Sequence, residues 1–299
     1  MYDPAVSRGK EDAAGRHATA EPERYNVMDD APVALITGGS RGIGRSTALA
    51  LGRSGHSVVI GYKSNLEAAE EVQGMLSQLG ARSIVARMDL EEPADITQAL
   101  LTTQETFGRL DVLVANAAAT AAKPIMTLGQ HHLVRTMAVT FNSFVQLVQE
   151  SVPLMAGRPG AIIAVSGIDT RVATSNHGLL GAAKAAMEAL VRSLAVELAP
   201  VDISVNAVAP GPIATDSARH YAGVKWAEYE REWIERTPAG RVGTPDDIGV
   251  IIDFLASPAS RWIRGQVIVA DGGFTLVTEP VDRFLSAVPA ATSTNGGHS

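Results

Sequence analysis

The chain has 299 residues, of which 46% are apolar and 19% charged, a composition typical of globular proteins. Its lack of cysteine excludes disulfides, thiolate catalysis and cysteine-ligated zinc. A formal net charge of -7 at pH 7 excludes a broad basic surface for nucleic acid. The N-terminal segment has no apolar run of the signal-peptide kind, and no later segment is long and apolar enough to span a membrane. We therefore expect a cytoplasmic protein.

The two ends of the chain differ in composition from its middle. Residues 1–30 are polar and rich in Ala, Glu, Arg and Pro, and residues 279–299 have a similar character. Such segments bury too little apolar surface to offset the entropy lost on ordering. We predict a disordered N-terminal tail over 1–30, one folded domain over 31–278 and a flexible C-terminal tail over 279–299.

Within this domain, short apolar runs alternate with longer segments of helical periodicity. The segments 65–80 and 93–108 are amphipathic, and each ends in the Gly expected just beyond a helix C-terminus. This alternation predicts an α/β domain with a mostly parallel sheet and helices on both faces. The seven apolar runs predicted as strands cover residues 33–37, 57–62, 82–88, 111–116, 160–166, 203–208 and 266–272.

The glycine-rich stretch ITGGSRGIG joins the first predicted strand to the first predicted helix. Gly38, Gly42 and Gly44 allow a tight turn, close approach of a pyrophosphate and close helix packing, with the helix N-terminus facing the anion. NAD-binding proteins usually carry an acidic residue about 20 residues further on, whereas NADP-binding proteins place a base nearby. Lys63 follows the second strand and Arg41 lies in the loop, which favours NADP. The alternative is that both are solvated surface cations.

Four motifs, TGGSRGIG, DVLVANAAA, VNAVAPGPIATD and GQVIVADGG, occur in this order over almost all of residues 33–275. Together they resemble the short-chain dehydrogenase/reductase family. The resemblance implies a single Rossmann-type doubly wound domain with seven parallel strands, a dinucleotide cofactor, no metal, and a homodimer or homotetramer built on long helices. By position, it implies a cofactor site formed by Gly38, Ser40, Arg41, Gly42, Ile43, Gly44, Lys63, Asp89, Leu90, Asn116, Ala117, Lys184, Pro210, Gly211, Ile213 and Thr215.

The segments GAAKAAMEALVRSLAVELAP and TPAGRVGTPDDI look most like the enoyl-thioester reductase branch of that family. This branch includes bacterial enoyl-acyl-carrier-protein reductases and the cyclohexenylcarbonyl-CoA reductases of antibiotic pathways. The implied substrate is an unsaturated acyl thioester, either a small molecule or a carrier-bound acyl group.

The catalytic positions of the family are largely replaced in this sequence. Counted back from Lys184, the tyrosine position of carbonyl reductases holds Leu180 and that of enoyl reductases holds His177. The usual serine position holds Gly167, with Ser166 beside it. The helix asparagine that commonly organises a water relay is replaced by Thr140. Among these positions, only the lysine matches unambiguously.

Reduction of a conjugated C=C by hydride leaves an enolate that a hydrogen-bond donor must stabilise and protonate. The imidazole of His177 can do both, with Asp169 favouring its charged form and Lys184 opposing it. We predict Lys184, His177, Ser166 and Asp169 as the catalytic candidates, with Lys184 also bonding the cofactor ribose. The alternatives are that His177 only begins a helix, capped by Ser175 or Asn176, and that Asp169 is a surface loop charge.

Residues 215–238 correspond to the variable substrate lid of the family. This segment concentrates much of the sparse aromatic content in Tyr221, Trp226, Tyr229 and Trp233. These side chains suggest an apolar cover for a ring or an acyl chain. Simple packing of an amphipathic helix explains any single one of them equally well.

Three functions are compatible with this sequence. The first is an NADPH-dependent enoyl-thioester reductase that uses His177 as its proton donor. The second is a non-redox cyclase, isomerase or dehydratase of natural-product biosynthesis on the same scaffold, and the third is a cofactor-binding pseudoenzyme. The retained dinucleotide framework favours bound NADP, and the lost serine, tyrosine and asparagine argue against ordinary carbonyl reduction. We favour the first function.

Overall fold

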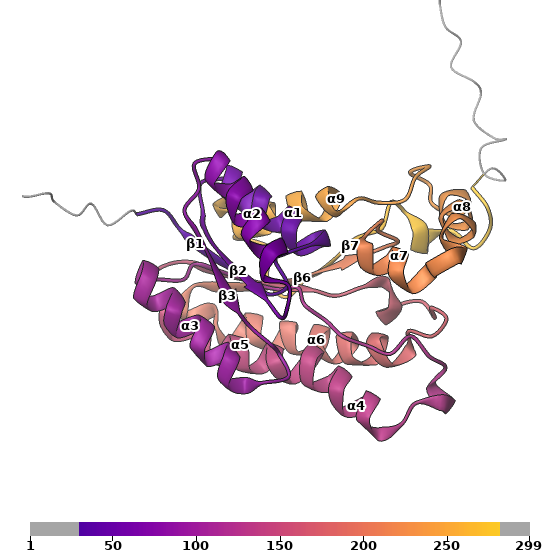
Figure 1. Cartoon of the computed structure of the whole chain (residues 1–299), viewed down its shortest axis with the longest axis horizontal. Helices are drawn as coiled ribbons and strands as arrows, with labels where there is room; N and C mark the ends of the chain where they lie inside the picture. The colour runs from indigo at the N-terminus through magenta and orange to yellow at the C-terminus, as the bar shows by residue number, and fades with distance from the viewer. Residues whose placement is uncertain (1–29, 282–299) are drawn as a thin grey trace, which may run out of the picture. The chain divides into compact units, whose positions relative to one another are not determined.

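Seven parallel strands form one sheet in the order β3-β2-β1-β4-β5-β6-β7 in a computed structural model that describes residues 30–281 (Figure 1). The predicted α/β fold and its seven strands are confirmed. The predicted tails, 1–30 and 279–299, lie almost entirely outside the described residues. The strands are β1 (Val33–Ile36), β2 (Ser57–Tyr62), β3 (Ser83–Arg87), β4 (Val112–Ala115), β5 (Gly160–Val165), β6 (Ile203–Pro210) and β7 (Val267–Ala270).

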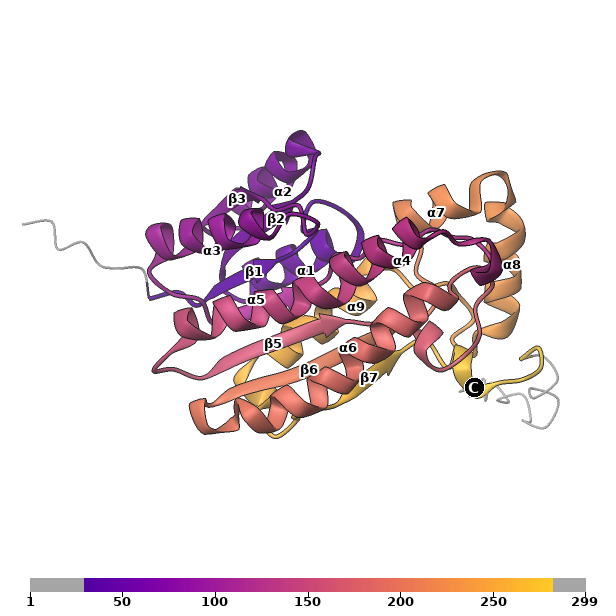
Figure 2. The same cartoon turned by 90° about the horizontal axis from the view of Figure 1, so that it is seen from below.

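Helices cover both faces of the sheet (Figures 1 and 2). Side chains of α1 (Gly42–Arg53), α2 (Leu66–Gln78) and α9 (Pro245–Ala256) form one apolar core with the sheet. Those of α3 (Pro93–Phe107), α5 (Ser143–Ser151) and α6 (Gly178–Glu197) form the second core on the opposite face. Because both faces are covered, the central strands β4 and β5 are buried at every residue.

Local sequence signals explain where several helices begin and end. The side chain of Asn65 caps α2 by accepting a hydrogen bond from the backbone of Ala68. Pro93 stands in the first turn of α3, where its missing N–H costs nothing. Gly108 ends the same helix in a left-handed conformation with φ of 70°, as predicted from its place beyond the periodic segment.

The remaining helices lie towards the carboxyl ends of the strands. A π-helical turn, Ala138–Asn142, joins α4 (Gln130–Met137) to α5, and a 3-10 turn, Ile168–Thr170, precedes α6. The helices α7 (Asp216–Ala222) and α8 (Trp226–Arg236) follow β6 and form the predicted lid segment. Between residues 30 and 281 the structure contains no helix with the length and apolarity needed to cross a membrane.

The strand order reverses between β1 and β4, which are neighbours in the middle of the sheet. The connections that leave these two strands therefore diverge to opposite faces. In doubly wound sheets this divergence opens a crevice at the carboxyl ends of the strands, and ligands bind there. The glycine-rich loop after β1 and Asn116 after β4 both lie at this point.

The packing of α1 on α9 requires a glycine at position 249. A Cβ there would lie 2.6 Å from the Ser46 hydroxyl and 3.0 Å from its backbone carbonyl carbon. We expect Gly249→Ala to lower the free energy of unfolding by about 1–3 kcal/mol through overpacking. The exposed helical residue Gly74 has no atom within 4 Å of its Cβ position, so Gly74→Ala should raise stability by about 0.5–1 kcal/mol. Urea unfolding midpoints test this pair, and shifts of the same sign in both variants would contradict it.

Candidate active site

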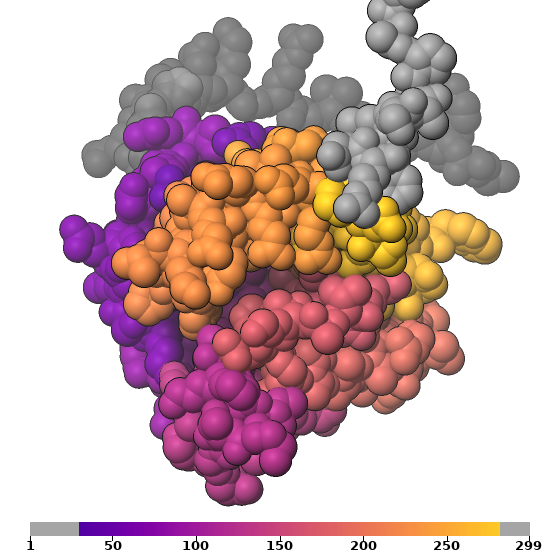
Figure 3. Space-filling model, turned by 90° about the vertical axis from the view of Figure 1, so that its right-hand side faces the viewer, coloured from indigo at the N-terminus to yellow at the C-terminus, as the bar shows by residue number. Residues whose placement is uncertain are grey.

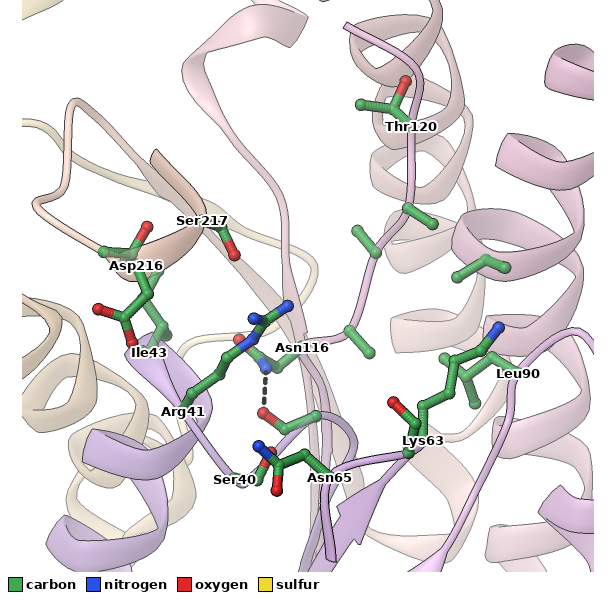
Figure 4. A pocket seen from close by; sticks show the side chains of 18 of the residues that line it. Ser40, Arg41, Ile43, Lys63, Asn65, Leu90, Asn116, Thr120, Asp216 and Ser217 are labelled. Carbon is green, nitrogen blue, oxygen red and sulfur yellow. Dashed lines mark hydrogen bonds between the residues drawn. The ribbon is translucent and has the colours of Figure 1, made fainter. Parts of the chain in front are cut away.

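A cavity of about 450 Å³ opens at the reversal of strand order (Figure 4). This volume lies in the range usual for small-molecule and cofactor sites. The predicted residues that line it follow the first five strands or lie at the start of α7. They are Gly38, Ser40, Arg41, Gly42, Ile43, Lys63, Asp89, Leu90, Asn116, Ala117, Thr215 and His177.

The glycine-rich loop forms the floor of this cavity. A Cβ on Gly44 would lie 2.1 Å from the carbonyl oxygen of Gly38, so the first turn of α1 packs directly on the loop. Asn116 locks the contact by donating its side-chain amide to the carbonyls of Thr37 (2.9 Å) and Gly38 (3.2 Å). The first turn of α1 contains no acidic residue and no side-chain cap. Its N-terminus therefore offers unoccupied backbone donors to an anion such as a dinucleotide pyrophosphate.

Charged side chains gather at one end of the cavity, after β2 and β3. The ammonium of Lys63 lies 2.9 Å from Asp89 and 2.5 Å from Glu91. Arg135, from α4, donates to Glu91 over 3.1 Å. Arg41 extends from the opposite wall into the cavity (Figure 4). Sequence reasoning identified Lys63, Asp89 and Arg41, but it missed Glu91 and Arg135.

Lys184 lies at the other end of the site, on α6. Its ammonium donates to the carbonyl oxygen of Ser166, the residue after β5, over 2.6 Å. Burial lowers the pKa of Lys184 below its usual value, and the carboxylates of Asp169 and Glu188 oppose this shift. The structure therefore holds the lysine firmly between the end of β5 and α6.

His177 is the N-cap residue of α6, and its side chain makes no capping hydrogen bond. The prediction that Ser175 or Asn176 caps this helix is therefore wrong. The free imidazole lines the cavity, and its Nδ1 lies 4.0 Å from Oδ2 of Asp169. That carboxylate oxygen is buried and has no hydrogen-bond partner within the described residues. The Asp169 carboxylate also interacts electrostatically with the ammonium of Lys184.

The carboxylate of Asp169 occupies the space beside Gly167, the position where the family has its serine. A Cβ on Gly167 would lie 2.5 Å from Oδ1 of Asp169 and 3.4 Å from Nζ of Lys184. Gly181 lets this turn approach α6, since a Cβ there would lie 2.4 Å from the Asp169 carbonyl oxygen. The aspartate and the glycine are therefore a coupled replacement: the side chain of one fills the place left by the other.

Ser166 does not line the cavity. It is only 1% exposed, and its hydroxyl donates to Oε1 of Glu188 over 2.5 Å. Thr170 donates to the same oxygen over 2.9 Å. Sequence reasoning missed Glu188, although its position one helical turn after Lys184 places both side chains on the same face of α6. In this arrangement Ser166 supports the partly buried Glu188 carboxylate instead of facing a substrate.

The other predicted cofactor residues follow β6 or belong to the helices. Thr215 lines the cavity and caps α7, whereas Ile213 lines a neighbouring cavity behind the loop. Gly211 packs on Asp271, with 2.6 Å between its Cβ position and the Cβ of that residue. Pro210 ends β6, two residues beyond the predicted strand, because the strand continues to pair with β7.

The aromatic residues of the lid segment divide into two groups. Tyr221 lines the cavity. Trp226, Tyr229 and Trp233 contact one another on α8, with ring centroids 5.8 and 6.2 Å apart. The lid faces α4 and the start of α6 across a groove in Figure 3, where α7 and α8 are orange and α4 is magenta. The expected aromatic cover is thus limited to Tyr221 in this conformation.

A family model described as enoyl-(acyl carrier protein) reductase matches residues 38–275. The chain belongs to the short-chain dehydrogenase/reductase family. This membership places it in a family of oxidoreductases that bind a nicotinamide cofactor. The glycine cradle, the open helix N-terminus and the size of the cavity fit such a group.

Three similar proteins illustrate this relationship. A 1-cyclohexenylcarbonyl-CoA reductase from Streptomyces collinus is 38% identical over 259 residues, 87% of this chain and 92% of the relative. A hydroxynaphthalene reductase-like protein from Metarhizium anisopliae is 34% identical over 252 residues, 81% of this chain and 94% of the relative. The solved structure of a Serratia marcescens short-chain dehydrogenase/reductase mutant is 29% identical, with a TM-score of 0.76 over 82% of this chain and 98% of that one.

The steric coupling of Gly167 with Asp169 is testable by a double-mutant cycle. We expect Gly167→Ala to lower the free energy of unfolding by about 1–3 kcal/mol, because the new methyl group collides with the carboxylate. In an Asp169→Ala background, Gly167→Ala should lower the free energy of unfolding much less. Chemical unfolding of the four proteins measures the coupling, and equal costs in both backgrounds would contradict it.

Proposed function

We propose that the protein is an NADPH-dependent reductase of unsaturated acyl thioesters in which His177 donates the proton. The observation that carries the proposal is the position of His177. Its imidazole faces the dinucleotide-sized cavity with the Asp169 carboxylate behind it, whereas the other candidate position holds Leu180, which has no proton to give. The relationship to a 1-cyclohexenylcarbonyl-CoA reductase supports the thioester class of substrate.

A reduced nicotinamide bound in the cavity would supply a hydride to the β-carbon of the conjugated C=C. The electron pair of that double bond moves towards the thioester carbonyl, whose oxygen becomes negative. His177 then donates a hydrogen bond to this oxygen and supplies the proton that ends on the α-carbon. The Asp169 carboxylate stabilises the imidazolium electrostatically before the transfer. We also propose that Lys184 binds the ribose hydroxyls of the dinucleotide, the role that the family resemblance implies.

The choice of NADP rests on charge at the adenosine end of the cavity. Arg41 and Lys63 offer two cations to a 2′-phosphate, and β2 is followed by no acidic residue of the kind that holds a ribose 2′-hydroxyl. We propose that Asp89 and Leu90, which line the same cavity, contact the adenine. We also propose a cytoplasmic location and a role in natural-product biosynthesis, by analogy with the same reductase branch.

Removal of the imidazole is the direct test of the proton donor. Absorbance loss of NADPH is followed with a panel of unsaturated CoA and carrier-protein thioesters to find a turnover substrate. On that substrate, His177→Ala should lower kcat by about 10²–10⁴-fold, because enolate protonation loses its acid. The affinity for NADPH should change little. The control is His220→Ala on the exposed side of α7, which should retain turnover.

Two outcomes would contradict the proposal. Unchanged turnover in His177→Ala would show that another group is the donor. Tight binding of NADPH without oxidation on every thioester would instead favour the non-redox enzyme or the pseudoenzyme, with the dinucleotide in a structural role.

We further propose that the protein is a homodimer or homotetramer assembled through α6. The exposed face of this helix carries a row of small residues, Ala182, Ala185, Ala189 and Ser193, which allows close helix pairing. Val196 continues the row and is 77% exposed.

We expect light scattering to show an oligomer that Ala189→Arg dissociates. The large charged side chain would prevent the helices from approaching. Ser77→Arg, on the exposed face of α2, is the control and should leave the assembly intact. A monomeric wild-type protein, or an intact oligomer of Ala189→Arg, would contradict this interface.

A further inference from the structure

Glu91 holds together the cations that surround the adenosine end of the cavity. Its Oε1 accepts from Lys63 over 2.5 Å and from Arg135 over 3.1 Å. These two partners come from different elements, since Lys63 follows β2 and Arg135 lies on α4. All three side chains line the cavity. One carboxylate oxygen therefore joins two elements at this end of the proposed cofactor site.

Glu91 and Asp89 are held in different ways. Asp89 is 15% exposed and its Oδ1 also accepts the backbone N–H of Glu91, so the local turn fixes it. The Glu91 carboxylate is 31% exposed, and the hydrogen bonds and ion pairs identified for it all come from flexible cationic side chains. The ion pair lowers the pKa of Glu91 and raises that of Lys63, so both groups are charged near neutral pH. An incoming anion can displace Glu91 without disturbing the backbone.

We infer that Glu91 is a specificity-determining residue whose carboxylate competes with the 2′-phosphate of NADP for Lys63, and so limits the preference for NADPH over NADH. The inference rests on the proposed binding of a nicotinamide dinucleotide in this cavity. A 2′-phosphate is a dianion whose oxygens accept hydrogen bonds from an ammonium, as the oxygens of a carboxylate do. It therefore competes for Lys63 with Glu91, and also with Asp89, whose Oδ1 lies 2.9 Å from the same ammonium. Asp89 is fixed by the local turn and is present in every variant below, so Glu91→Gln removes one of two competing carboxylates.

NADH has no group that needs to replace Glu91. Its ribose hydroxyls are neutral, so the Lys63–Glu91 pair survives when NADH binds. The Glu91 carboxylate therefore weakens the binding of NADPH and leaves the binding of NADH almost unchanged. Arg41 has no such competitor among residues 30–281 and remains available to the phosphate in either case.

The test is isothermal titration calorimetry of the full-length protein with NADPH and with NADH, in the absence of substrate. Glu91→Gln keeps the size of the side chain and removes its charge. We expect the ratio of Kd for NADH to Kd for NADPH to rise roughly two- to fivefold, from tighter NADPH binding, in line with one exposed ion pair. This rise in the ratio of dissociation constants should become smaller as the salt concentration increases.

Two further variants isolate the cause. Glu92→Gln removes the same charge from the next residue, an exposed glutamate outside the cavity, and should leave the ratio unchanged. In a Lys63→Met background, Glu91→Gln should lose most of its effect, because the contested ammonium is gone.

A ratio that is unchanged or lower in Glu91→Gln would overturn the inference, as would an equal rise in Glu92→Gln. Failure of both dinucleotides to bind would overturn it together with the proposed cofactor. Binding is measured without turnover, so a protein that binds NADPH but reduces no thioester contradicts the reductase proposal alone.

Discussion

The contact of the first turn of α1 with the glycine-rich loop is the constraint on which the rest of the site depends. A Cβ on Gly44 would lie 2.1 Å from the Gly38 carbonyl oxygen, so only glycine permits this approach. Asn116 fastens the loop from β4 through Thr37 and Gly38. The contact joins the two halves of the sheet where strand order reverses, and it leaves the N-terminus of α1 open to an anion.

At the opposite end of the site, the side chains around Lys184 are arranged by steric contacts and by charge. Asp169 can stand beside Lys184 only because Gly167 has no side chain, and its second oxygen then faces His177. Ser166 turns away to hydrogen-bond Glu188, which adds a second carboxylate near the lysine. These substitutions are sterically and electrostatically coupled, so replacing any one of them alone leaves a clash or an unbalanced charge.

The charged side chains at the two ends of the candidate site differ in how firmly they are held. At the adenosine end, Lys63 and Glu91 are partly exposed and their ion pair is exchangeable for a ligand anion. Near α6, Lys184 is held by a backbone carbonyl and by burial, so its ammonium keeps one position. Lys63 and Glu91 line the cavity, whereas Lys184 is not among the residues that line it.

The sequence by itself determined the seven strands, the glycine-rich loop and the end of α3 at Gly108. These features depend on periodicity and on backbone preferences of neighbouring residues. It also identified His177, which is counted back from Lys184, and Asp169, which follows the fifth predicted strand. Only the tertiary structure decided that Ser166 faces Glu188 and that Glu91 bridges Lys63 to Arg135. The physical reason is that these partners lie on different elements, and their contacts depend on strand order and helix packing that no local pattern specifies.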